Sequence, residues 1–504
     1  MTTINDIITR GFDCHQSGRL AEAESAYREA LEMDSDNAEL HNLMGVLKLQ
    51  QNDTLAALEW AEKAVLLKPC EYFYETLFQI YIRSEAYEKI IYYAQSMLEK
   101  YPKNFSLIFN IALAYKNLKQ YKKSIEFYEK ALKINPSSYQ GWFNLAHVYE
   151  IEGQAKNAVS AMKICHKLKP KDKDTDYFYA TSLMKAKNYD KGLPLFENRQ
   201  CRDLAILTQT KSYPNLAAPE HLWKGENIKD KTIFVYYEAG YGDVIMFSRY
   251  LPLLKNKCKK ILFQPQRPLI PLFEQSGLGI DELIDGYIPE KDLEFDVHAP
   301  IMSLPYLLGL KGQNVFESPE GYLFAKPELV EEYKSKYFNT DKIKIGIKWQ
   351  GNTYFDKDRV IPAEEFATLI ETEGTHFYSF QTFEGSEDLK KLTKKYKITD
   401  IGTNLLDFGQ TAAALMNLDL VICNDTSLAH LAGALGIPCW VILPYEVNWR
   451  WHTDLSHCDW YSSVRLFRQT IPGEWKGIFN DIKLLIEKRL DMANLNHKGD
   501  RAIV

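Results

Sequence analysis

The sequence contains 504 residues, of which 46% are hydrophobic and 25% are charged, and its formal net charge is -6 at pH 7. A chain of this length predicts about three folding units. The composition is that of a folded globular protein, which excludes a disordered chain. The negative charge argues against a general nucleic-acid-binding protein, which would normally carry a strong basic excess.

The cysteines and the N-terminal segment indicate the cellular compartment of the protein. Eight cysteines are scattered without a C-x-x-C pair, so we expect neither a zinc site nor a disulfide framework. Residues 1–20 lack the basic and apolar regions of a signal peptide, and no later segment reaches about 18 uncharged apolar residues. We therefore expect a cytoplasmic protein with no membrane span.

The first two hundred residues repeat with a period of 34. The clearest copy contains, in order, Trp142, Leu145, Ala146, Tyr149, Gly153, Ala158, Met162, Cys165 and Pro170. This period, with small residues where paired helices touch, is typical of tetratricopeptide repeats. We predict an array of about six repeats over residues 1–206, with a third copy shifted by one residue at Pro102 and an atypical sixth copy that caps the stack.

Arrays of this kind usually bind an extended peptide or a partner helix on their concave face. We therefore expect a protein or peptide partner for residues 1–206. The alternative is that the array is only a scaffold or a surface for homo-oligomerisation, because the repeating positions are packing positions.

The second half alternates strands and helices. Polar residues, proline and glycine predict a linker at 207–228. Apolar runs then follow in two groups, TIFVYY, KILFQ and FDVHA, then IKIGIKW, FYSFQ, DLVICND and PCWVILP. Separated by helical stretches, they predict parallel sheets in two Rossmann-like subdomains, at 229–330 and 341–490, with a tail at 491–504. We expect a ligand in the cleft at the carboxyl ends of the strands.

A glycine-containing turn directly follows the first predicted strand. Gly240 and Gly242 let the backbone approach a ligand closely, and Asp243 lies where a carboxylate could face the cleft. The alternative is that Asp243 only caps the helix that follows.

A second group of polar residues follows the strand DLVIC. Asp425, Thr426 and Ser427 lead into a helix of small residues, whose amides, hydroxyls and dipole suit a diphosphate. His430 lies one turn into that helix. Taken alone, Thr426 and Ser427 could merely cap the helix, and His430 could be a core histidine.

Six motifs occur in order with the expected strand and helix context. They are W-K-G-E at 223–226, G-Y-G-D-V-I-M-F-S-R-Y-L-P-L-L, W-Q-G-N, D-R-V-I-P, N-D-T-S-L-A-H-L-A-G-A-L-G and P-Y-E-V-N-W-R-W. Together they resemble the heptosyltransferase-related glycosyltransferases of family nine. The closer resemblance is to bacterial proteins that fuse tetratricopeptide repeats to such a module. It implies a multidomain chain, with an all-α solenoid followed by an α/β module of the GT-B fold.

The resemblance also implies roles for individual residues. Asp243 matches the acidic residue proposed as catalytic base in the family. Arg359 stands where the family has a basic residue on the donor phosphate, although Val360 before Ile361 departs from the family pattern. Arg450, in an aromatic block at 445–468, is our choice for a further ligand contact. The predicted donor-binding residues are Gly240, Gly242, Lys348, Gln350, Arg359, Asp425, Thr426, Ser427, Leu428, His430 and Arg450.

Two D-x-D spacings, at 172–174 and 356–358, resemble patterns that hold a divalent metal beside a nucleotide sugar elsewhere. Both lie in charged, loop-like sequence, which favours chance. We expect no metal and no cofactor besides the nucleotide sugar as co-substrate.

The sequence thus predicts transfer of a sugar from a nucleotide-sugar donor to a hydroxyl of a protein recruited by the repeats. Flagellin is a plausible acceptor, because some fused relatives glycosylate flagellins. By resemblance the reaction inverts the anomeric centre. The alternatives are a non-catalytic adaptor whose module only binds nucleotide, and a glycosyltransferase acting on lipid or polysaccharide.

Overall fold

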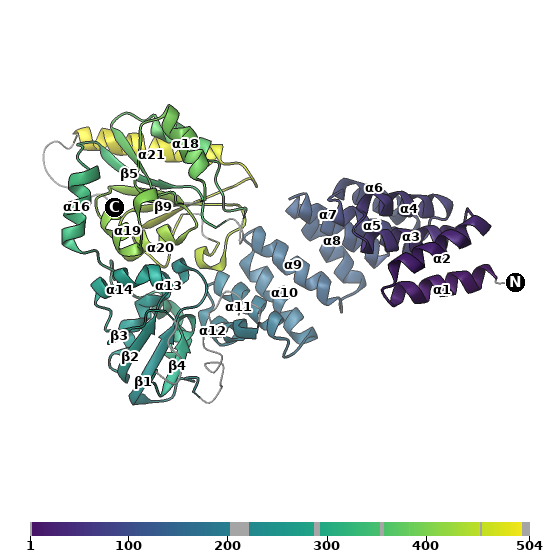
Figure 1. Ribbon diagram of the computed structural model, residues 1–504, viewed down its shortest axis with the longest axis horizontal. Helices are drawn as coiled ribbons and strands as arrows, with labels where there is room; N and C mark the ends of the chain where they lie inside the picture. Colours follow the sequence, from purple (N-terminus) through teal and green to yellow (C-terminus); the bar gives the residue numbers. More distant parts are fainter. Residues whose placement is uncertain are drawn as a thin grey trace. The chain divides into compact units, whose positions relative to one another are not determined.

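The chain forms two compact units, Met1–Glu152 and Gly153–Val504. The computed structural model describes residues 3–201, 221–286, 293–352, 357–382, 384–453 and 456–495. Most of the linker predicted at 207–228 lies outside these residues. Figure 1 shows a purely helical N-terminal part and an α/β part with two sheets.

The first two hundred residues are all-helical, as the 34-residue period predicts. In chain order the helices are α1 (Ile4–Gln16), α2 (Leu20–Met33), α3 (Ala38–Gln50), α4 (Thr54–Leu67), α5 (Glu71–Arg83), α6 (Tyr87–Lys100), α7 (Phe105–Asn117), α8 (Tyr121–Ile134), α9 (Tyr139–Ile151), α10 (Ala155–Leu168), α11 (Lys173–Lys185) and α12 (Tyr189–Phe196). The first unit ends after α9, and the second begins at the turn before α10.

The period is visible in the residues that start and end the helices. The first helix of most copies begins after an oxygen-bearing side chain that accepts a hydrogen bond from a backbone N–H in its first turn, at Thr3, Asn37, Asn104, Ser138 and Asp172. The turn to the second helix contains one left-handed residue, at Gly18, Asn52, Glu85, Lys119, Gly153 and Lys187. Glu85 comes one residue early, in the same copy in which Pro102 is shifted.

The second unit contains two parallel sheets. The smaller sheet has strand order β3-β2-β1-β4, and every pair in it is parallel. Its strands are β1 (Ile228–Tyr236), β2 (Cys258–Gln264), β3 (Glu282–Leu283) and β4 (Val297–Pro300). The helices that follow β1 and β2 are α13 (Tyr241–Phe247) and α14 (Ile270–Ser276). The second halves of β1 and β2 are buried and mostly apolar because helices cover them, whereas their first halves carry exposed charged residues.

The larger sheet has strand order β10-β9-β8-β5-β6-β7, again with every pair parallel. Its strands are β5 (Ile343–Lys348), β6 (Thr375–Ser379), β7 (Ile398–Asp400), β8 (Leu420–Asn424), β9 (Cys439–Leu443) and β10 (Val464–Arg468). The chain order reverses between β5 and β8, which makes their carboxyl ends a topological switch point. Two such sheets after a repeat array are consistent with the predicted fold class.

Helices cover both faces of the larger sheet. They are α16 (Pro327–Tyr337), which connects the two sheets, then α17 (Ala367–Ile370), α18 (Ser386–Lys395), α19 (Phe408–Leu415), α20 (Ser427–Ala434) and α21 (Lys476–Leu495). A short helix in the smaller half, α15 (Leu304–Leu307), follows β4. The tail predicted at 491–504 begins inside α21, and residues 496–504 lie outside the described residues.

The last repeat helices share a hydrophobic core with the α/β part. Tyr189, Leu193 and Phe196 are buried in the same cluster as β1 residues Ile233 and Val235. The sequence assigned α10–α12 to the array that ends at residue 206. In the structure they belong to the compact unit of the sheets, because the buried residues of α12 pack both on α11 and on the first sheet.

A buried ion pair joins the end of the array to the first sheet. Arg199, after α12, pairs with Glu238, after β1, at 2.6 Å between Nη2 and Oε1, and about 5% of each side chain is exposed. Ser303 Oγ accepts a further hydrogen bond from Arg199 Nη2 at 2.7 Å. Because both charges are buried this deeply, they stabilise the fold only when both partners are present.

No helix within the described ranges is long and apolar enough to cross a membrane.

Replacing Arg199 with Met should leave the Glu238 carboxylate buried without its partner. We expect the free energy of unfolding of the second unit to fall by about 3–5 kcal/mol. Denaturant titration followed by circular dichroism measures this. The matched control is Lys260→Met, which removes an exposed pair with Glu282 and should cost about 1 kcal/mol or less. Equal losses in both variants would contradict the structural role of Arg199.

Candidate functional site

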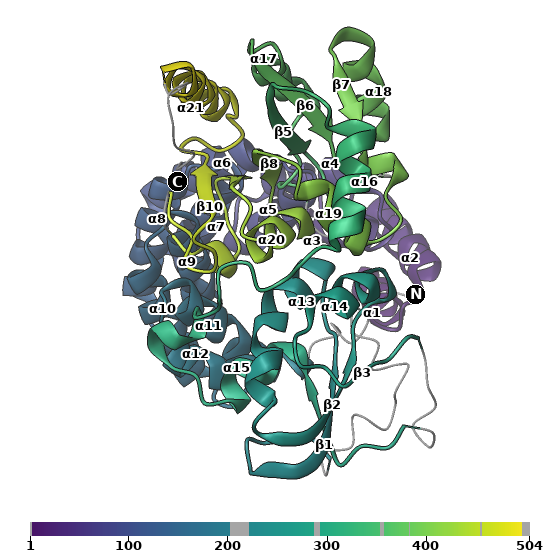
Figure 2. The ribbon, with the colours of Figure 1, turned by 90° about the vertical axis from the view of Figure 1, so that its left-hand side faces the viewer.

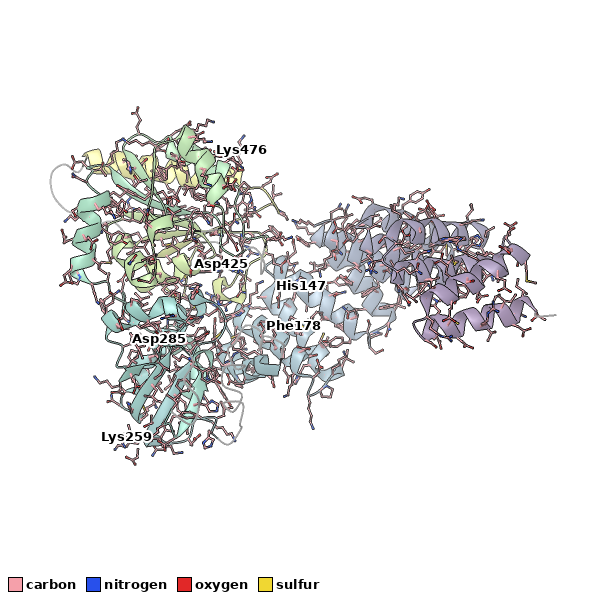
Figure 3. All side chains as sticks on the ribbon, viewed as in Figure 1. His147, Phe178, Lys259, Asp285, Asp425 and Lys476 are labelled. Carbon is pink, nitrogen blue, oxygen red and sulfur yellow. The ribbon has the colours of Figure 1, made fainter. Side chains whose placement is uncertain are left out.

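A cavity of about 740 Å³ lies where the two sheets of the second unit face each other. All twelve residues that the sequence predicted for the site line it. They are Gly240, Gly242, Asp243, Lys348, Gln350, Arg359, Asp425, Thr426, Ser427, Leu428, His430 and Arg450. They follow the carboxyl ends of β1, β5, β8 and β9, so the topology brings together segments more than two hundred residues apart. Figure 3 labels Asp425 at the junction of the two halves.

Helices α13 and α20 form opposite walls of this cavity and pack against each other. Figures 1 and 2 both show them between the two sheets. At the contact, a Cβ atom added to Gly242 would lie 2.7 Å from His430 Cδ2 and 3.4 Å from Ser427 Cα. The walls can therefore approach this closely only because residue 242 has no side chain.

Asp243 both caps its helix and faces the cavity. Its Oδ2 accepts a hydrogen bond from the Gly240 N–H at 3.1 Å. Asp243 therefore does cap the helix, as the alternative interpretation of the sequence held. Its Oδ1 forms an ion pair with Arg450 Nη2, and about 15% of each side chain is exposed. The half with the smaller sheet thus holds the Asp243 carboxylate by a hydrogen bond, and the half with the larger sheet pairs it with Arg450.

Arg359 approaches the start of α20. Its Nη1 lies 3.4 Å from Asp425 Oδ2, and Asn424 Nδ2 donates to the Arg359 carbonyl at 2.9 Å. About a third of the Arg359 side chain is exposed toward the cavity, whereas Asp425 is buried. Thr426, at the N-cap of α20, makes no side-chain capping bond to the helix. An anion at this helix start would meet backbone N–H groups and a guanidinium together.

Lys348 ends β5 and is buried at the floor of the cavity. Its ammonium donates to the Phe380 carbonyl at 3.1 Å and to Thr382 Oγ1 at 3.3 Å. Burial lowers the pKa of Lys348 to about 8, because a desolvated ammonium is less stable than a hydrated one. A bound phosphate would add negative charge beside this ammonium, to which the nearby Glu384 already contributes.

His430 combines both interpretations that the sequence left open. It is only 4% exposed, its Nδ1 lies 3.1 Å from Tyr461 Oη, and its ring stacks on Trp451 at 5.1 Å. It nevertheless lines the cavity. Burial lowers the pKa of His430 to about 3, so the ring is neutral at physiological pH. It contributes to the shape of the cavity but not to its charge.

Several residues that line the cavity were not predicted. Thr382 and Glu384 follow β6 in the way that Gln350 follows β5, so the strand-end rule could have found them. Others come from a loop after β7 and the start of α19, where no motif stands out, namely Leu405, Leu406, Asp407, Phe408 and Thr411. The Phe408 ring contacts the Tyr241 ring of α13 at 5.1 Å between centroids, which adds an aromatic contact between the halves.

The two D-x-D spacings have different outcomes. Asp172 caps α11 by accepting from the Thr175 N–H at 2.9 Å, which explains it as a helix signal. Asp356 lies outside the described residues, so the second spacing stays untested.

Comparison with known proteins finds matching segments in both parts of the chain. Residues 324–442 match the family model of glycosyltransferase family 9 (heptosyltransferase). Residues 11–52, 107–138 and 127–159 match models of tetratricopeptide repeats. The chain joins tetratricopeptide repeats to a family 9 glycosyltransferase domain. The matched segment of this domain contains Lys348, Arg359 and the start of α20, whereas Asp243 and Arg450 lie outside it and join the site through the geometry described above.

The curated relative FlbA of Caulobacter vibrioides is 24% identical over 291 residues, which are 52% of this chain and 47% of FlbA. The chain thus matches about half the length of this relative. Similar solved structures include PilF of Pseudomonas aeruginosa, with a TM-score of 0.35, 16% identity and coverage of 40% of this chain and 92% of that one. Another is a thermophilic tetratricopeptide repeat protein of Thermus thermophilus, with a TM-score of 0.30, 20% identity and coverage of 36% and 100%.

Replacing Gly242 with Ala tests the contact between the walls. The added methyl group would overlap His430, and overpacking of this kind costs about 1–3 kcal/mol. We expect nucleotide affinity, measured by isothermal titration calorimetry, to fall about tenfold or more. Gly477→Ala is the control, because Gly477 lies outside the cavity lining and an added methyl group there meets no atom within 4 Å. Equal affinities in the two variants would show that the close approach of α13 and α20 is unimportant.

The lowered pKa of Lys348 predicts that nucleotide binding depends on pH. Its ammonium is protonated below a pKa of about 8 and attracts phosphate only in that form. Affinity for a nucleoside diphosphate should therefore fall as pH rises through 8, by up to about tenfold per pH unit for one proton. Lys348→Arg keeps its charge throughout this range and should flatten the profile between about pH 7 and 9.5. The same slope in both proteins would exclude Lys348 as its cause.

Proposed function

We propose that this cavity binds a nucleotide sugar and transfers the sugar to a hydroxyl group of a protein acceptor brought by the repeats. The observation that carries the proposal is the convergence of Asp243, Lys348, Arg359 and Arg450 on one cavity in a chain with a family 9 glycosyltransferase domain. The reaction needs a carboxylate for the acceptor proton and cations for the departing phosphate.

The larger sheet supplies the donor side in this proposal. The nucleotide phosphate lies at the start of α20, where the backbone N–H groups and Arg359 face it, and Lys348 supports it from the floor. These groups stabilise the negative charge that forms when the bond between the anomeric carbon and the phosphate oxygen breaks. The scheme uses side-chain cations for this charge and needs no metal.

Asp243 supplies the acceptor side. As the acceptor oxygen attacks the anomeric carbon, its proton passes to the Asp243 carboxylate. The ion pair with Arg450 must loosen first, because Oδ1 is engaged and Oδ2 holds the Gly240 N–H. An incoming donor phosphate gives Arg450 a second anion to contact, which releases Oδ1 for the acceptor. One base and one displacement invert the anomeric centre, as the resemblance implies.

The repeat array supplies the acceptor protein. Repeat arrays present extended concave surfaces that bind peptides. A flagellin is our proposed acceptor, as implied by the resemblance to fused glycosyltransferases of this kind. The reaction is proposed to take place in the cytoplasm, where the donor nucleotide and a newly made acceptor meet.

Asp243→Asn tests the base. The amide keeps an oxygen for the Gly240 N–H but cannot take the acceptor proton, so kcat should fall by about 10²–10⁴ while nucleotide affinity stays within a few-fold. Sugar transfer is followed by the mass increase of the acceptor. The control is Asp407→Asn, at a cavity-lining aspartate that caps α19, for which we expect transfer rates near those of the unmodified protein. Full turnover by Asp243→Asn would remove Asp243 as the base.

Removing the first unit tests acceptor recruitment. A chain of residues 153–504 keeps α10–α12 and the complete cavity. We expect it to melt cooperatively, to bind nucleotide as the full chain does and to modify protein acceptor at least about 100-fold more slowly, which corresponds to about 3 kcal/mol of lost acceptor binding. Unchanged protein modification would rule out recruitment by the first unit. Transfer to lipid or polysaccharide acceptors by the same chain would support the small-molecule alternative.

A further inference from the structure

Arg450 reaches the cavity from a short turn, which we call the Arg450 turn, comprising residues 449–452. The turn contains one 3-10 segment, Trp449–Trp451, followed by His452. His452 is 2% exposed and has a φ of +51° and a ψ of -150°, a positive-φ conformation that is costly for a residue with a side chain. A buried residue keeps this conformation only where its surroundings hold it.

The last repeat hairpin provides these surroundings. Tyr189 Oη, at the start of α12, lies 2.8 Å from His452 Nε2. On the other side of the ring, His452 Nδ1 lies 2.8 Å from Asp459 Oδ2, and the same oxygen lies 2.7 Å from Lys187 Nζ. Nε2 can accept from the Tyr189 hydroxyl when the ring carries its proton on Nδ1, the nitrogen that lies in close charge contact with the Asp459 carboxylate.

The charge on Asp459 fits this arrangement. Burial favours the neutral acid, but the contacts with His452 and Lys187 outweigh it and lower the pKa of Asp459 below its ordinary value. The carboxylate is therefore ionised at neutral pH, and it joins the hairpin to the Arg450 turn.

A second route runs through Trp460. The Trp460 ring contacts the Tyr189 ring at 5.9 Å between centroids, and its Nε1 donates to the Arg450 carbonyl at 2.7 Å. Arg249 Nη1 in turn donates to the Trp460 carbonyl at 2.9 Å. The backbone of Arg450 is thus held by a residue that packs on the repeat hairpin, independently of the bond to His452.

We propose that Lys187 and Tyr189 of the last repeat are positioning residues that hold Arg450 in the cavity through Asp459 and His452. The last hairpin is then a part of the donor site and not only the end of a binding array. The consequence for donor binding rests on the proposed function, whereas the positioning itself does not.

Hydrogen exchange measured by mass spectrometry tests the positioning in the full chain. Tyr189→Phe keeps the aromatic contacts and removes only the hydroxyl group, and Lys187→Met removes the charge from a partly exposed side chain. Loss of one such bond should make the amides of residues 449–452 exchange about fivefold faster. Tyr250→Phe is the matched control, because it removes a buried hydroxyl bonded to the Val315 carbonyl, and residues 449–452 should exchange in it as in the unmodified protein. Unchanged exchange in both test variants would overturn the proposal.

A double-mutant cycle tests the route to the donor. Affinity for UDP, GDP, ADP and CMP, each in turn, is measured by calorimetry. For the nucleotide that binds, Tyr189→Phe should weaken affinity about fivefold, and this loss should disappear in an Arg450→Met background. Equal losses in both backgrounds would show that Tyr189 does not act through Arg450. Binding of none of the four would count against the proposed function, while the exchange experiment would still decide the positioning.

Discussion

The missing side chain at Gly242 is the constraint on which the site depends. It lets α13 of the smaller sheet lie against His430 of α20 in the larger sheet, so the starts of both helices open into one cavity. Each wall alone carries common features. The first has an aspartate after strand β1, and the second has the start of a helix after strand β8. Held together, they place Asp243 and Arg450 in contact across the cavity. A wider separation would leave Asp243 and the start of α20, the proposed phosphate site, on unrelated surfaces.

Much of this site is readable from sequence because parallel sheets impose a simple rule. Residues that follow the carboxyl ends of strands meet at one edge, so Gly240, Lys348 and Asp425 could be placed together from local patterns alone. The 34-residue period was equally readable, since it recurs in caps and turns such as Asn37 and Asn52. Strand β3 escaped prediction because its two residues, Glu282 and Leu283, are too few to show a period.

The remaining features depend on contacts between distant segments. Asp243 and Arg450 are 207 positions apart, and Tyr189 and His452 are 263 apart. No local pattern marks such pairs, because each partner looks like an ordinary cap, aromatic core residue or turn until the chain has folded. The grouping of α10–α12 with the sheets in one compact unit also depends on such contacts. The period of α11 and α12 is that of a repeat, but the apolar face of α12 is covered by residues of the first sheet.

The covering of α12 has a consequence for how such a chain can change in length. In a solenoid each hairpin contacts only its neighbours, so hairpins can be gained or lost wherever both sides present repeat surfaces. Here the far side of α12 is already occupied by the hydrophobic core of the α/β part, and Pro194 and the break at Phe196 shorten the helix to eight residues. Hairpins can therefore be gained or lost only in the part of the array that precedes α12. The number of hairpins can vary while the geometry around Arg450 stays the same, which makes the array a spacer of adjustable length attached to an unchanging site.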